Sequence, residues 1–273
     1  HSFTEARSDG TFVEGLKEVP KESGSDEATS SKFQVNLTLR AHSEPPTLDS
    51  VSVGQILPFW IHQITSTSLN GYIGRSLRAY CTALESSHSA SVASKLNASF
   101  KSGQVVLAAI TEVDKEKSKI QVSIRAVHQE ASVATSPAQL STDRTTFVKV
   151  IGFKFPFLRV QAFDKTFGRV TVTELNDVYD EKPMEVWTAK EGQFLEARLV
   201  SSKAATKDDG EAHHYFSLRK SVVNPSSKTS SKANPRIVSY TDIAPGNEYS
   251  GYISRHFADK HFCFVFLGDS IVA

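Results

Sequence analysis

The sequence predicts an all-β protein built from small five-stranded barrels that repeat in tandem and are joined by polar linkers. Alternation of apolar and polar residues, the period of a half-buried strand, dominates the chain. Helical periodicity is weak outside short stretches at residues 85–96 and 175–187. Similar strand ends close on arginines 40, 125 and 219, which lie 85 and 94 residues apart, a length that fits one small barrel.

Individual strands follow from this alternation. The alternating apolar sets are Phe33, Val35, Leu37 and Leu39; Ile120, Val122 and Ile124; Phe153, Phe155 and Phe157; and Val170 and Val172. Within the first strand of one repeat, Phe59 and Trp60 are adjacent. We therefore expect one of them in the core and the other partly exposed.

Three recurring signals mark the repeat boundaries. The closing strands end in Val35–Arg40, Gln121–Arg125 and Tyr215–Arg219; a Gly-Gln pair opens the strands Gly103–Leu107 and Gly192–Glu196; and the opening signals are Val53–Ile56 and Pro245–Glu248. They predict the end of one repeat in residues 1–44, complete repeats in 50–128 and 143–222, and the beginning of a further repeat in 237–273. We expect the chain to be a fragment, because it starts at His1 and its last residues read as an unfinished strand.

Segments rich in Ser, Lys, Thr and Pro separate these units. They are Glu22–Lys32, Glu130–Thr142 and Asn224–Pro235, and their composition predicts linkers or long loops that bury too little apolar surface to become ordered.

Composition excludes several classes of protein. The 273 residues hold 31 Lys and Arg against 30 Asp and Glu, so the chain is no bulk polycation that binds nucleic acid by field strength alone. No apolar run approaches the roughly 18 residues of a membrane-spanning helix. Two cysteines exclude a disulfide framework, and Cys81 and Cys263, each within a strand, read as buried apolar residues.

One motif carries a family resemblance. Gly168–Leu175 resembles the third-strand signature of the S1-type RNA-binding repeat, an OB-fold barrel, and the Gly-Gln strand and the closing strand Phe216–Arg219 fit the same family. In the preceding repeat, the corresponding segment departs from the pattern, with Leu77 in place of Gly and Ala83 in place of the acidic residue.

Tandem, divergent S1-type repeats with Ser/Lys-rich linkers resemble the large nucleolar ribosomal RNA processing protein five family, also called programmed cell death protein eleven. Bacterial ribosomal protein S1 also carries tandem repeats of this type. The nucleolar resemblance implies precursor ribosomal RNA and ribosome assembly factors as partners, a nuclear and nucleolar location, and no catalysis, cofactor or membrane contact. We expect each repeat to bind weakly, with flexible linkers that raise the effective concentration of the next.

OB-folds bind single strands through aromatic platforms flanked by cations on the second and third strands. The residues that this predicts for RNA binding are Tyr72, Arg75, Arg78, Phe163, Lys165, Phe167, Arg169, Phe262 and Phe264. Further candidates in the third repeat are Phe153, Phe155, Phe157, Lys154 and Arg159, although the alternating Phe row is also typical of a core.

Charge is segregated along the second complete repeat. Arg144–Arg169 holds six basic residues and one acidic residue, whereas Glu174–Glu196 holds seven acidic and two basic residues. This pattern predicts either a basic RNA-binding side with an acidic back, or two ordinary solvated surfaces.

Two other functions remain open. Degenerate repeats that keep the barrel can dock assembly proteins, which the near-zero net charge and the changed signature at Leu77 and Ala83 favour. Such repeats are also appended to ribonucleases and translation factors. Catalytic motifs are lacking, and the His213–His214 pair, with Asp208, Asp209 and Glu211 nearby, has neither a Cys nor a second spaced pair to complete a metal site.

Overall fold

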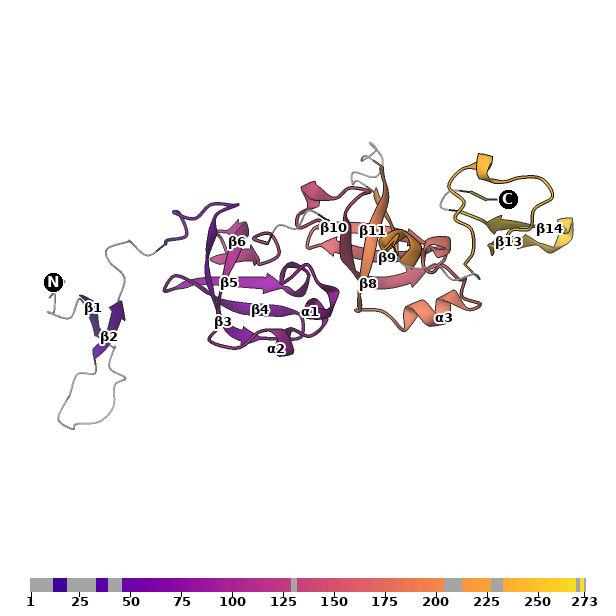
Figure 1. The fold of residues 1–273 in the computed structure, drawn as a ribbon. Coiled ribbons are helices and arrows are strands. Elements are labelled where there is room, and N and C mark those ends of the chain that lie inside the picture. Colours follow the sequence, from indigo (N-terminus) through magenta and orange to yellow (C-terminus); the bar gives the residue numbers. More distant parts are fainter. Residues whose placement is uncertain are drawn as a thin grey trace, which may run out of the picture. The chain divides into compact units, whose positions relative to one another are not determined.

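The computed structural model describes residues 12–18, 33–38, 46–128, 132–203, 213–226, 233–268 and 271–272 (Figure 1). The chain divides into two units, His1–Pro45 and Pro46–Ala273. In the first unit, β1 (Phe12–Glu18) pairs with β2 (Phe33–Thr38) as an antiparallel hairpin. The expected strand is therefore present over residues 33–38, and Leu39 lies outside the described residues. Arg40 and the predicted linker Glu22–Lys32 lie outside the described residues.

The second unit begins with a closed five-stranded barrel. Its strands are β3 (Ile56–Ile64), β4 (Ser68–Ile73), β5 (Leu77–Thr82), β6 (Val105–Asp114) and β7 (Lys119–Ser123). They close in the order β3-β4-β5-β7-β6, and only the β5–β7 pair is parallel. Alternation sends Phe59 and Ile61 into the core with no exposed surface, while Trp60 stays 42% exposed. The expectation for Phe59 and Trp60 is confirmed.

A second closed barrel follows with the same topology. Its strands are β8 (Thr145–Lys154), β9 (Phe157–Phe163), β10 (Thr166–Thr171), β11 (Phe194–Lys203) and β12 (His213–Ser217). The order is β10-β12-β11-β8-β9, with β10 and β12 parallel. Two closed five-stranded barrels in tandem confirm the predicted all-β fold class, and the five-stranded Greek-key barrel is the OB architecture.

Helices are few and short. They are η1 (Ala83–Glu85), α1 (Ala90–Ser94), α2 (Leu96–Ser99), η2 (Pro137–Gln139), η3 (Val172–Glu174), α3 (Pro183–Thr188), α4 (Lys220–Val223), η4 (Tyr240–Asp242) and η5 (Ala258–Lys260). In the described part of the chain, no helix is long and apolar enough to cross a membrane.

The segment before the second barrel is ordered where it is described, which corrects the expectation of an unordered linker at Glu130–Thr142. Val133 forms a parallel bridge with Thr145, and Ala134 is fully buried. Thr135 donates a side-chain hydrogen bond to Gln139. The composition of the segment does not indicate this order, because the surface that covers Ala134 is supplied by the neighbouring barrels.

A third structured region follows the second barrel. It contains an antiparallel hairpin of β13 (Tyr252–Phe257) and β14 (Phe262–Phe266). Phe266 packs edge-on against Phe155 of the second barrel, and Tyr252 packs against Tyr179. Part of the predicted linker Asn224–Pro235 is held as well, since the Asn234 side chain accepts a hydrogen bond from the Tyr179 amide.

Candidate nucleic-acid interface

A row of four side-chain positions crosses the outer face of the first barrel. In the strand register, Trp60 on β3 lies opposite Tyr72 on β4, Tyr72 opposite Arg78 on β5, and Arg78 opposite Lys119 on β7. We call these four residues the Trp60 row. All four alternate with inward residues and are at least partly exposed. The row therefore places two aromatic rings beside two cations on one face.

The aromatic end of the Trp60 row is a cluster of rings. Trp60 and Tyr72 stack with centroids 5.7 Å apart and an interplanar angle of 29°. His62 lies 5.7 Å from Trp60 and 5.9 Å from Tyr72. Packing between rings of this kind restrains them, so a base that stacks on the cluster meets a preformed platform.

One glycine lets this cluster form. A Cβ atom on Gly71 would lie 1.8 Å from the Trp60 carbonyl oxygen, so only glycine permits β3 and β4 to approach this closely. A register shift between Ile61 and Gln63 accompanies the approach. At this bulge His62 and Gln63 are both exposed, although regular alternation would bury one of them.

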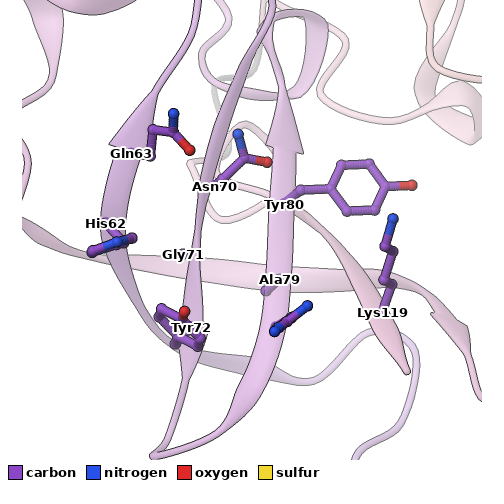
Figure 2. A pocket seen from close by; sticks show the side chains of 9 residues that line it. His62, Gln63, Asn70, Gly71, Tyr72, Ala79, Tyr80 and Lys119 are labelled. Carbon is purple, nitrogen blue, oxygen red and sulfur yellow. The ribbon is translucent and has the colours of Figure 1, made fainter. Parts of the chain in front are cut away.

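The face is hollowed beside the row, in a pocket of about 380 Å³ (Figure 2). Its lining residues are His62, Gln63, Asn70, Gly71, Tyr72, Arg78, Ala79, Tyr80 and Lys119. Strands β3, β4 and β5 carry no Asp or Glu, because none occurs between Val51 and Leu84. The hollow thus combines amide groups, aromatic rings and cations, which suits a base with its phosphate.

Tyr80 connects this pocket to the second barrel. Its hydroxyl donates a hydrogen bond to Gln121 Oε1 at 3.0 Å. The amide of Gln121 in turn donates to Asp164 in the turn between β9 and β10. Partial burial, together with the carboxylate of Glu112, raises the pKa of Tyr80, so the hydroxyl stays protonated at neutral pH and remains a donor.

The second barrel presents a row across the corresponding strands, beyond the β-bulge between Val150 and Gly152, where the first barrel has Gln63, Asn70, Tyr80 and Gln121. Gly152 on β8 lies opposite Arg159 on β9, Arg159 opposite Arg169 on β10, and Arg169 opposite Tyr215 on β12. We call these four the Arg169 row. The Arg169 row has two cations, as the Trp60 row does, but one aromatic ring in place of two.

Cations of the second barrel lie over aromatic rings. The Arg169 guanidinium is 5.7 Å from the Phe157 ring centroid, and the Lys203 ammonium is 5.3 Å from that of Tyr215. Both distances are within the range of cation–π attraction. Arg159 and Arg169 are exposed, and an exposed arginine serves both phosphate contacts and stacking under a base.

Solved structures share parts of this fold at low similarity. A chain of the a/eIF2alpha–aDim2p–rRNA complex from Pyrococcus horikoshii OT3 matches with 22% identity over 29% of this chain and 47% of that one, with a TM-score of 0.27. GSP13 from Bacillus subtilis matches with 23% identity over 33% and 73%, with a TM-score of 0.27. A multidomain protein with nucleic acid binding domains from Streptococcus pneumoniae matches with 13% identity over 80% and 71%, with a TM-score of 0.24. The chain spans about half the length of the first of these, and it matches no protein-family model and no curated protein.

The structure brings three of the predicted RNA-binding residues into the two rows: Tyr72, Arg78 and Arg169. Arg75 is exposed in the turn between β4 and β5, outside the Trp60 row. Phe167 is 49% exposed on β10, opposite Gln161. All five side chains are at least partly exposed.

Phe163 is not available for stacking, which corrects its selection as a platform. Its ring is 1% exposed and packs in the core of the second barrel. The Arg125 guanidinium lies 4.2 Å from its centroid. Phe163 is the last residue of β9 and is covered by Arg125 of the first barrel, whereas Phe167, the second residue of β10, is exposed.

Lys165 is exposed but engaged, because its ammonium lies 2.7 Å from Glu112 Oε2 of the first barrel. Phe262 and Phe264 on β14 are each 42% exposed and pack with Phe257 into a cluster, with centroid distances of 5.0 to 5.9 Å. The predicted Phe row of the second barrel is divided. Phe153 and Phe155 pack on the core, whereas the ring of Phe157 lies near the Arg169 guanidinium.

Several residues of the two rows escaped prediction as site residues. From the sequence, Trp60 is named only as the neighbour of Phe59, and no site role is assigned to His62, which lies beside the Trp60 row. Lys119 and Tyr215 reach their rows through parallel pairs with β5 and β10, and no local pattern signals such pairs. For Trp60 and His62 a signal existed: a strand of alternating residues that lacks carboxylates and exposes large rings.

Other candidate groups take no part in the two rows. Among the described residues, no three His, Cys, Asp or Glu side chains gather as a metal would require. Asp208, Asp209, Glu211 and the His213 side chain lie outside that description. Cys81 is buried, as predicted, and burial raises its thiol pKa, while Cys263 is half-buried.

Proposed function

We propose that the two barrels bind single-stranded RNA through the Trp60 row and the Arg169 row, as a scaffold without catalytic activity. The observation that carries the proposal is the Trp60 row, in which a stacked Trp–Tyr pair continues into an arginine and a lysine across four strands. Stacking accepts any base, and the cations follow the backbone. This arrangement supports binding with little sequence preference.

The biological setting of the proposal comes from the family resemblance. Tandem S1-type repeats of the nucleolar ribosomal RNA processing family imply precursor ribosomal RNA as the ligand and ribosome assembly factors as neighbours. We therefore place the chain in ribosome biogenesis and in the nucleolus. Precursor ribosomal RNA contains single-stranded spacers and loops, the form of RNA in which bases are free to stack.

The test is the affinity of residues 1–273 for a fluorescent single-stranded oligonucleotide of about 20 nucleotides, measured by anisotropy. Trp60→Ala and Arg78→Ala are expected to weaken binding by about 5- to 150-fold each, the equivalent of one lost stacking or phosphate contact. Tyr240→Ala removes an aromatic side chain that is 65% exposed outside both barrels, and it is the matched control. Equal affinity of all four proteins would refute the proposal.

A second function, protein docking, is favoured by one surface of the first barrel. Ile56 on β3 and Val105 and Leu107 on β6 are 51%, 60% and 54% exposed, and Pro58 pairs with Leu107 in the register. In the second barrel, Phe194 occupies the position of Val105 after the Gly-Gln pair. Phe194 packs against Phe147 and against Ala90 and Ala93 of the preceding helix α1.

The same surface is thus covered by a small apolar helix in one barrel and open in the other, which supports docking of an apolar helix of a partner protein on the first barrel. Leu107→Lys is expected to abolish capture of such a partner and to leave RNA affinity unchanged. Loss of RNA binding in this variant, with protein capture intact, would contradict the docking proposal.

A further inference from the structure

The arginine that closes each repeat has no part in either row, yet it recurs in the sequence at positions 40, 125 and 219. Two of the three fall in the described residues, and both are almost wholly buried: Arg125 is 0% exposed and Arg219 is 3% exposed. Arginines are rarely buried unless their guanidinium groups have hydrogen-bond or ionic partners. The contacts of these two guanidinium groups therefore indicate their role in the repeat.

Arg125 leaves the first barrel after β7 and reaches into the second. Nη2 donates to the Ala134 carbonyl at 2.7 Å and to Thr146 Oγ1 at 2.6 Å. Nη1 donates to the Ala162 carbonyl at 3.2 Å. The guanidinium also lies between two rings of the second barrel, 4.6 Å from Phe147 and 4.2 Å from Phe163. One side chain of the first repeat therefore contacts the connecting segment, β8 and β9 of the next.

The same group is tied back to its own barrel. Nη1 donates to the Leu84 carbonyl at 3.4 Å, and the Arg125 backbone amide donates to the Glu85 carbonyl at 3.0 Å. Within the described residues, every group that accepts a hydrogen bond from the Arg125 side chain is neutral. Burial lowers the pKa of the Arg125 guanidinium to about 10, a value that still leaves the group charged at neutral pH. A fixed cation between two barrels, held by carbonyls and rings, is a geometric link between them.

Arg219 repeats part of this arrangement after the second barrel. Its Nη2 donates to the backbone carbonyl of Asn234 in the following segment, as that of Arg125 does to Ala134. Its Nε lies 3.2 Å from Asp177 Oδ1. The two closing arginines thus share one contact, a carbonyl of the chain that leads into the next repeat. Among the described residues, Arg125 alone of the two also contacts the strands of a complete barrel beyond it.

Polar contacts continue the link from Arg125 to the pocket beside the Trp60 row. Thr82 donates to Asp164 Oδ1 at 2.6 Å, and Gln121, the partner of Tyr80, donates to the other oxygen of the same carboxylate. On the outside, Lys165 pairs with Glu112. The turn between β9 and β10 of the second barrel is therefore joined to the strands that carry Tyr80 and Lys119.

We propose that Arg125 is a positioning residue that fixes the second barrel against the first, so that the two rows form one binding track for a single strand of RNA long enough to reach both. The inference rests on the proposed RNA binding. It differs from the expectation of independent repeats on flexible linkers, because the two barrels are held in a fixed relative position. Such a pair loses less orientational freedom on binding than two repeats that move independently.

The experiment compares oligonucleotides of about 5 and about 20 nucleotides, which occupy one barrel and both barrels. Wild-type 1–273 is expected to bind the long strand about 100-fold more tightly than the short one. Arg125→Ala is expected to weaken binding of the long strand about 10-fold and to leave binding of the short strand unchanged. Arg219→Ala, an equally buried closing arginine at the next junction, is the matched control and is expected to keep the wild-type ratio.

Rotational diffusion supplies a readout that does not depend on RNA. Amide ¹⁵N relaxation is expected to give one correlation time for both barrels of the wild type and two different values in Arg125→Ala. If the alanine variant loses the buried signal of Trp187, Arg125→Lys takes its place, because lysine keeps the charge but lacks the forked donors. Its expected result is the same separation of correlation times.

The outcomes separate the two proposals. Failure of wild type to bind either strand refutes RNA binding, and the relaxation data then judge the role of Arg125 alone. Normal RNA binding with an unchanged length ratio and a single correlation time in the Arg125 variants refutes the positioning role. A drop in affinity for both strand lengths by the same factor also refutes it, because that result indicates a direct contact with RNA.

Discussion

Gly168 allows a sharp test of how the second barrel closes. A Cβ atom at this position would lie 2.4 Å from Phe216 Cε2 and 2.7 Å from the His214 carbonyl oxygen. Ordinary contact begins at 3.4 Å, so β10 and β12 must separate by about 1 Å to admit an alanine. Among the described residues, two pairs join these strands, Gly168 with His214 and Arg169 with Tyr215, so this separation strains the contact that closes the barrel.

The chain supplies a matched control in Gly152, also within a strand of the same barrel, where an added Cβ meets nothing within 4 Å. We expect Gly168→Ala to destabilise the barrel by about 2 kcal/mol, from overpacking of about 1–3 kcal/mol less the entropy that glycine loses on folding. Gly152→Ala should stabilise it by up to about 1 kcal/mol. For a domain of this size, the two variants should differ in Tm by roughly 8–20 °C.

Trp187 provides the assay. It is 2% exposed in the core of the second barrel, and its indole N–H donates to Asp180 at 2.9 Å. In a Trp60→Phe background, the emission of Trp187 alone reports unfolding of this barrel on heating. Melting of Gly168→Ala and Gly152→Ala within about 2 °C of each other would refute the reasoning.

Three further predictions follow from the two faces and their junction. Lys119→Ala should reduce the slope of log affinity for RNA against log salt by about 0.7, the value for one lost phosphate contact, whereas Lys182→Ala, whose ammonium pairs with Glu185 at 3.2 Å, should keep the wild-type slope. Phe163→Ala should lower the free energy of unfolding by about 3–5 kcal/mol, because it leaves a cavity in the core, whereas Phe167→Ala should lower it by less than about 0.5 kcal/mol. Urea titration measures both values, and equal losses would contradict the assignment of Phe163 to the core. Burial, opposed by the Thr82 hydrogen bond and by Lys165, raises the pKa of Asp164 above its ordinary 3.8, so stability should fall as pH rises from 3.8 through the raised pKa, and this fall should be absent in Asp164→Asn.

Repeated patterns made the barrels predictable. Alternation identified the strands, and the spacing of the closing arginines identified the length of one repeat, because both are local in sequence. The register across strands is not local. Trp60 meets Lys119 only through two antiparallel pairs and one parallel pair that joins β5 to β7, and a parallel pair needs a long connection that no turn signal marks.

Phe163 shows a second limit of prediction from the sequence. Its neighbours Lys165 and Arg169 made it look like a stacking residue, but its burial depends on Arg125, which lies 37 residues before Ala162 and belongs to another repeat. Ala134, whose carbonyl accepts a hydrogen bond from Arg125, is also buried. Contacts between repeats decide these positions, and composition within one repeat does not report them.

Emission of Trp60 during titration with single-stranded RNA tests the central claim most directly. Trp60 is 42% exposed at the end of its row, and Trp187 is buried in the other barrel, so a base that stacks on the row should quench the first and leave the second unchanged. We predict saturable quenching that is absent in Trp60→Phe and shifted to about 5- to 150-fold higher RNA concentration in Tyr72→Ala. RNA binding that leaves Trp60 emission unchanged would contradict the account.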